Sequence, residues 1–170
     1  GLVVNPPAGD SSSDLHDNSV SLVIEFGEFQ YVTTGDAEID AEERMAEEWS
    51  TELEADVYHA GHHGSSTSST DPFLDVVDAE ISIISSAYDS QYGHPHDEVL
   101  TSFADRDVET YWTGVHGDII ITTAGDGSID VAVSEEFPTD PEVLLDEKPT
   151  DDEASLSSTG IGAQLTGVVA

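Results

Sequence analysis

Apolar and polar residues alternate along the chain in short runs that predict strands and helices in turn. Apolar-rich runs at 20–26 and 29–34 are separated by Gly27 and Glu28, which predicts a tight antiparallel hairpin. Over 38–49 the apolar residues recur with helical spacing and acids fill the other positions, so we expect a surface helix there. A short strand is predicted at 56–60.

The same alternation continues through the second half of the chain. A helix is predicted at 71–77 and a buried strand at 79–86, and Pro95 is expected to open another helix. Three closing strands are predicted at 108–112, 118–123 and 129–133. Strands that alternate with helices and are bracketed by hairpins predict an α+β fold with layered, mixed sheets.

Length and composition set the expected domain organisation. A chain of 170 residues, 37% of them apolar, is long enough for one domain with a core. We expect that domain to span 1–134, and the acidic stretch 135–170, which contains Pro, Ser and Gly, to form an irregular tail or linker. Because the chain begins with Gly1 and not with Met, we expect it to be either a processed product or a piece of a longer protein.

The charge of the chain is extreme. Asp and Glu total 37 against three basic residues, which gives a formal net charge of −34. Salt screens such self-repulsion, because the Debye length falls to about 3 Å near 1 M salt, so we expect a salt-adapted organism. No basic stripe is present that could hold nucleic-acid phosphates by counterion release. Any contact with nucleic acid is therefore expected to run through metal.

The chain has no cysteine, which excludes a disulfide framework and thiolate metal ligands. A metal would have to be bound by histidine and carboxylate. No apolar run is long enough to cross a bilayer, so any membrane attachment is expected to depend on segments outside these 170 residues.

Histidines cluster just beyond the predicted strands. Asp36 and the pair His62-His63 each follow the carboxyl end of a strand, and His94 lies between a strand and a helix. If these strands are neighbours in one sheet, the side chains share one rim and can converge on zinc, which takes imidazole and carboxylate ligands at about 2.0 to 2.2 Å. Each residue alone is also compatible with a turn, a helix cap or an exposed loop position.

Four motifs occur in an order that resembles a known family. They are Asn18-Ser19-Val20-Ser21-Leu22, Thr34-Gly35-Asp36, Gly61-His62-His63-Gly64-Ser65 and Tyr92-Gly93-His94-Pro95-His96. In this order, over roughly 3–133, the chain resembles the ComEC-like hydrolases of the metallo-β-lactamase fold, of a haloarchaeal type. The resemblance implies the C-terminal half of a four-layer αββα sandwich.

The resemblance also implies a metal centre and an activity. Two ions would be bound, zinc or alternatively manganese, with Asp36 bridging them, His62 or His63 on one ion and His94 on the other. Asp36, His63 and Ser65 are the candidate catalytic residues. The implied reaction is hydrolysis of a phosphodiester, with one strand of DNA during uptake as a candidate substrate.

The chain departs from the family in one respect. The His-x-His-x-Asp-His motif of these hydrolases is absent, and His16-Asp17 does not supply it. We therefore expect weak or no catalysis from these residues alone. The alternative function is a degenerate, non-catalytic module that binds a partner or supports another domain. An extracellular or cell-surface location is favoured over a cytoplasmic one.

Overall fold

The computed structural model describes residues 1–9 and 14–149 of the chain. Its strands are β1 (Leu2–Asn5), β2 (Ser21–Phe26), β3 (Phe29–Thr33), β4 (Val57–His59), β5 (Ile81–Ile84), β6 (Glu109–Trp112), β7 (Ile119–Thr123) and β8 (Ile129–Val133). Its helices are α1 (Ile39–Glu48), the short 3-10 turn η1 (Gly61–Gly64), α2 (Asp71–Val77), α3 (Asp97–Ala104), α4 (Thr113–His116) and α5 (Pro141–Glu147). The predicted strands and helices before residue 134 are therefore present, with ends shifted by one or two residues, and β1 is an additional strand that the sequence pattern did not predict.

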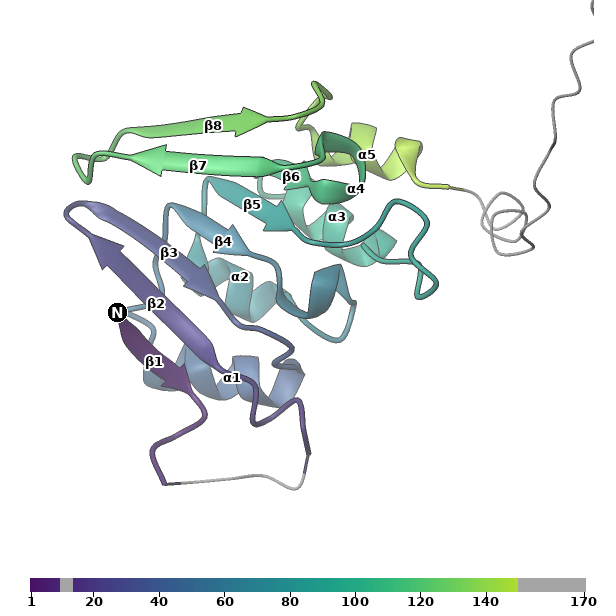
Figure 1. Ribbon diagram of the computed structural model, residues 1–170. Helices are drawn as coiled ribbons and strands as arrows, with labels where there is room; N and C mark the ends of the chain where they lie inside the picture. The colour runs from purple at the N-terminus through teal and green to yellow at the C-terminus, as the bar shows by residue number, and fades with distance from the viewer. Residues whose placement is uncertain (10–13, 150–170) are drawn as a thin grey trace, which may run out of the picture.

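The main sheet is mixed. Its six strands follow the order β1-β2-β3-β4-β5-β6 (Figure 1). β1, β2 and β3 pair antiparallel, and from β3 to β6 each pair is parallel because a helix returns the chain to the same end of the sheet. The carboxyl ends of β3, β4 and β5 consequently lie along one edge.

Helices cover one face of this sheet and the β7–β8 hairpin lies over the other (Figure 1). Alternate strand residues such as Val32, Tyr58 and Ile84 join the helices in the larger core. On the opposite face Phe29 and Val57 pack with hairpin residues such as Ile121. The predicted α+β class is confirmed. The described part forms a helix layer, a sheet and a hairpin, and the complete four-layer sandwich stays a prediction.

The tail prediction for 135–170 needs correction in its first part. Residues 141–147 form α5, in which Leu144 is completely buried in the larger core. Asp140 caps this helix by accepting the backbone N–H of Glu142, and Pro141 occupies its first turn. Residues 150–170 lie outside the described residues.

Two smaller expectations also change. Pro95 does not open α3, because the helix begins at Asp97 and the backbone N–H of His96 donates to the Gly64 carbonyl at 2.8 Å. Apolar residues on both faces of the run 20–26 predict a strand buried on both sides, but Ile24 and Phe26 in its second half are exposed. In the part of the chain that the structure describes, no helix has the length and apolar character needed to span a bilayer.

Candidate metal centre

The predicted site residues meet at the carboxyl edge of the parallel strands. Asp36 follows β3, His62 and His63 follow β4, and His94 lies in the loop between β5 and α3. The imidazole of His94 is 6.0 Å from that of His62 and 6.5 Å from that of His63, measured between ring centroids. The expectation that three separate motifs share one rim is thus confirmed.

A tight turn sets the position of Asp36. Gly35 has a φ of +58°, and a Cβ at this position would lie 2.5 Å from the hydroxyl of Ser19. That hydroxyl accepts the backbone N–H of Asp36 at 2.7 Å. Ser19, which belongs to the Asn-Ser motif before β2, therefore fixes the backbone of Asp36, which follows β3.

The His62-His63 pair has an unusual backbone. Both residues are left-handed, with φ of 49° and 60°, a conformation that costs non-glycine residues about 1 to 3 kcal/mol each and that clusters at functional sites. Beside them Gly64 packs so closely on Pro95 that a Cβ would lie 2.8 Å from the proline Cβ. This contact joins the loop after β4 to the loop that carries His94.

His63 is held in a position suited to a ligand. Its Nδ1 lies 2.8 Å from the carbonyl oxygen of Ser85, which fixes the proton on Nδ1. Its Nε2 lies 4.0 Å from the Oδ1 of Asp36. Metal-bound histidines characteristically donate their second N–H to a carbonyl or carboxylate in this way, which leaves the other nitrogen free to bind an ion.

His94 is nearly buried within the histidine cluster, with 9% of its surface exposed. Burial, followed by the charges of His96, His62 and His63, lowers the pKa of His94 to about 4. The ring is therefore neutral at pH 7 and keeps a nitrogen lone pair, which is the form that binds metal.

His96 has a different role from its neighbours. Its Nδ1 accepts the backbone N–H of Ser66 at 2.9 Å, and its Nε2 donates to the Tyr92 carbonyl at 3.1 Å. Both ring nitrogens are thus used within the protein. His96 ties the two loops together and is not a ligand in this arrangement.

Ser65 lies behind the rim. It is 5% exposed, and its hydroxyl lies 3.0 Å from that of Thr67. Thr67 in turn donates to the Oε1 of Glu38 at 3.0 Å and lies 3.4 Å from the Nδ1 of His62. The predicted catalytic role of Ser65 stays a prediction, and its observed contacts lead to Glu38 and His62.

Two rim residues were missed by sequence reasoning, namely His16 and Glu38. Together with His62 they bring three potential ligand atoms within 4.8 Å of one another. His16 lies outside the motifs of the family, and Glu38 resembles any other acid near α1. The proximity of Glu38 to Asp36 in the chain was the one available signal.

The residues at the rim fit a transition-metal ion. Imidazole nitrogens and carboxylate oxygens are the ligands zinc takes in proteins that offer no thiolate, and manganese accepts the same donors with a preference for oxygen. Among the described residues, His16, Glu38 and His62 are the three whose ligand atoms all lie within 4.8 Å of one another. Asp36, His63 and His94 are spaced more widely, with 4.0 Å between Asp36 Oδ1 and His63 Nε2 and 6.5 Å between the ring centroids of His63 and His94.

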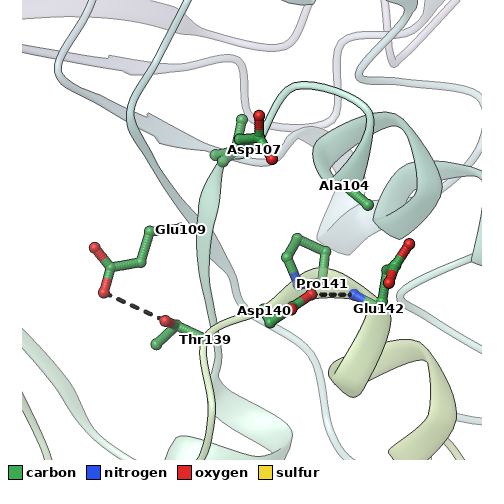
Figure 2. Close-up of a pocket in the computed structure, with 8 residues that line it drawn as sticks. Ala104, Asp107, Glu109, Thr139, Asp140, Pro141 and Glu142 are labelled. Atoms are coloured by element: carbon green, nitrogen blue, oxygen red, sulfur yellow. Dashed lines mark hydrogen bonds between the residues drawn. The ribbon is translucent and has the colours of Figure 1, made fainter.

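An acidic hollow also lies beside the amino end of β6 (Figure 2). It is lined by side chains at the end of α3, the start of β6 and the start of α5. Glu109, at the amino end of β6, hydrogen-bonds Thr139, and Asp140 caps α5. Glu109 and Asp140 therefore have structural roles in the hollow. No histidine lines it.

The chain is similar to part of two competence proteins. It is 31% identical over 117 residues to the "ComE operon protein 3" of Bacillus subtilis (strain 168), a match that covers 69% of this chain and 15% of that protein. It is 31% identical over 106 residues to the "Competence protein ComA" of Neisseria gonorrhoeae, covering 61% and 15%. No family profile matches the chain, and no solved structure matches it. The chain spans about 15% of the length of these relatives, and this homology supports its place in a ComEC-like family of competence proteins.

Proposed function

We propose that the chain carries part of the metal centre of a metal-dependent phosphodiester hydrolase that acts in DNA uptake. The observation that carries the proposal is the convergence of Asp36, His63 and His94 on one rim, with the Asp36 carboxylate 4.0 Å from the free nitrogen of His63. Similarity to competence proteins supports DNA as the substrate class. A cell-surface or extracellular location and a salt-adapted source are part of the same proposal.

Each residue has a defined task in this proposal. Asp36 would hold metal through its carboxylate, which has two oxygens and can contact two ions. His63 and His94 would supply neutral imidazoles. The bound ions would supply Lewis acidity toward a phosphodiester oxygen and lower the pKa of a water molecule. Ser65 would support the loop that carries the two histidines after β4.

The distribution of positive charge supports a role for metal in phosphate binding. The chain has three basic side chains, and each is paired with a carboxylate. Arg106 contacts Asp71 and Asp75 at 3.0 and 2.6 Å. The remaining pairs are Arg44 with Glu48 and Lys148 with Asp97. In the described part of the chain, every lysine and arginine side chain thus has a carboxylate partner, and in this proposal bound ions would hold the phosphate.

Hydrolysis of a simple phosphodiester and of single-stranded DNA tests this proposal. The full chain in molar salt, supplied with Zn²⁺ or Mn²⁺, is expected to show slow turnover that requires the metal. Asp36→Ala and His94→Ala are expected to reduce the rate to that of the blank. Asp40→Ala is the matched control, because it removes an equal charge from an exposed position at the start of α1.

The same experiment distinguishes the hydrolase proposal from the alternative of a non-catalytic module. Metal binding without metal-dependent turnover above the blank is the result expected of a non-catalytic module of this fold. That outcome would contradict the hydrolase proposal and favour a binding or supporting role.

A further inference from the structure

We propose that His16, Glu38 and His62 form a second, separate metal site, so that the adjacent residues His62 and His63 bind different ions. The site would take Zn²⁺ or a similar divalent transition-metal ion. Only the assignment of Asp36, His63 and His94 to the other ion rests on the proposed function. Binding at the second site requires no hydrolysis.

The spacing of the donor atoms matches a zinc site. The Oε1 of Glu38 lies 3.4 Å from the Nδ1 of His62 and 3.5 Å from the Nδ1 of His16. Ligand atoms bound to a tetrahedral zinc at about 2.0 to 2.1 Å lie about 3.3 Å from one another. Two of the three edges therefore already have the required length. The third edge, between the ligand nitrogens of His16 and His62, lies within 4.8 Å, and the two ring centroids are 4.9 Å apart.

The three donor groups match the ligands of a known class of zinc site. Two histidines and one glutamate are a known ligand set of catalytic zinc, in which the fourth position is left for water or substrate. Thr67 donates to the same Glu38 oxygen at 3.0 Å, which orients the carboxylate as outer-shell partners of metal ligands do. The three ligand side chains are neither fully buried nor fully exposed, so an ion can reach them from solvent.

The fold brings His16 to this place by specific contacts. The side chain of Asn5, at the end of β1, donates to the carbonyls of Asp17 and Ser19 at 3.0 and 2.5 Å. The His16 carbonyl accepts the backbone N–H of Ser19 at 2.9 Å, and the Asp14 carboxylate accepts that of His16 at the same distance. The hydrogen bond from the Asp36 backbone N–H to the Ser19 hydroxyl then joins this loop to the turn that carries Asp36 and Glu38.

The two adjacent histidines diverge. His62 places Nδ1 beside Glu38, whereas His63 places Nε2 beside Asp36 and fixes its Nδ1 on the Ser85 carbonyl. Their ring centroids are 6.4 Å apart. The left-handed backbone of both residues produces this divergence, and it gives each imidazole a different carboxylate.

Binding of Co²⁺ and Zn²⁺ to the full chain tests the assignment. Titration calorimetry counts the ions, and the visible absorption of Co²⁺ reports their coordination. His16→Ala, Glu38→Gln and His62→Ala are each expected to lose about one of two bound equivalents, whereas Asp36→Ala and His63→Ala lose the other. Thr67→Val should keep both ions and bind one of them about 10-fold or more weakly. Glu43→Gln, an exposed change on α1, is the control.

The outcomes are distinct. If His16→Ala and Glu38→Gln keep the stoichiometry and affinity of the wild type, the second site is wrong, even where Asp36→Ala loses an ion and the proposed function survives. If the His16, Glu38 and His62 variants lose their ion while Asp36→Ala loses none, the second site stands and the proposed function loses its metal. Circular dichroism of each variant without metal shows that a lost ion does not result from unfolding. His16→Asn serves as a second variant if His16→Ala fails to fold.

Discussion

Glu42 is a buried acid whose carboxylate accepts two backbone hydrogen bonds. It is fully buried on α1, and its two carboxylate oxygens accept the backbone N–H groups of Ser69 and Thr70 at 2.7 and 2.8 Å. These bonds join α1 to the segment that leads into α2. Burial raises the pKa of Glu42 above its ordinary value of 4.5, although the two hydrogen bonds act in the opposite direction.

This raised pKa predicts a pH dependence of stability. The folded state holds the Glu42 proton more tightly than the unfolded state, so this group's contribution to the free energy of unfolding falls as pH rises from about 4.5 through the raised folded pKa. Glu42→Gln cannot titrate. The difference in unfolding free energy, wild type minus Glu42→Gln, is therefore expected to decrease over this window when it is measured by urea denaturation in constant salt. A difference that increases with pH would contradict the account.

Gly64 is a second residue at which a substitution is expected to change stability, because the backbone leaves no room for a Cβ atom. Its φ is +81°, and an added Cβ would meet Pro95 at 2.8 Å. Gly64→Ala is expected to destabilise the protein by about 1 to 3 kcal/mol, since it combines backbone strain with a close contact. It should also weaken metal binding, because the contact joins the loops of His63 and His94. Urea denaturation and metal titration measure the two effects, and wild-type values in both would contradict this role.

At the scale of elements, α5 shows how a short helix can complete the core. Its Leu144 is completely buried, and its neighbour Val143 is 38% exposed. Leu144→Ala is expected to cost about 2 to 5 kcal/mol of unfolding free energy, as large-to-small core changes do. Val143→Ala, the matched control, should change it by about 0.5 kcal/mol or less. Equal, small effects in chemical denaturation would mean that α5 does not belong to the domain.

The elements that the sequence predicted correctly are those in which apolar residues recur with a regular spacing along the chain. The apolar run of β5 and the helical stripe of α1 depend on neighbouring residues, so they can be identified without knowing the fold. α5 was missed although Asp140 and Pro141 form a capping signal, because the surrounding prolines and acids indicated a tail. The convergence of Asp36, His63 and His94 was predictable from parallel strand order. The position of His16 was not, since it depends on Asn5 and on a loop folded against a distant turn.

At the scale of the whole molecule, charge is the dominant feature. A net charge of −34 on 170 residues destabilises the compact state by self-repulsion. Raising KCl from about 0.1 M to about 1 M shortens the Debye length from about 10 Å to about 3 Å. We therefore expect the melting temperature, followed by circular dichroism, to rise steadily over this range. A melting temperature that is constant or falls with salt would contradict a salt-adapted fold.

Metal content tests the central claim most directly. The full chain, dialysed in molar salt after exposure to Zn²⁺ or Mn²⁺, is analysed for bound metal beside Asp36→Ala, His94→Ala and the Asp40→Ala control. The account predicts about two equivalents in the wild type and the control, and a lower content in the two rim variants. Absence of bound metal in the wild type, or an unchanged content in both rim variants, would contradict the assignment of this rim as a metal centre.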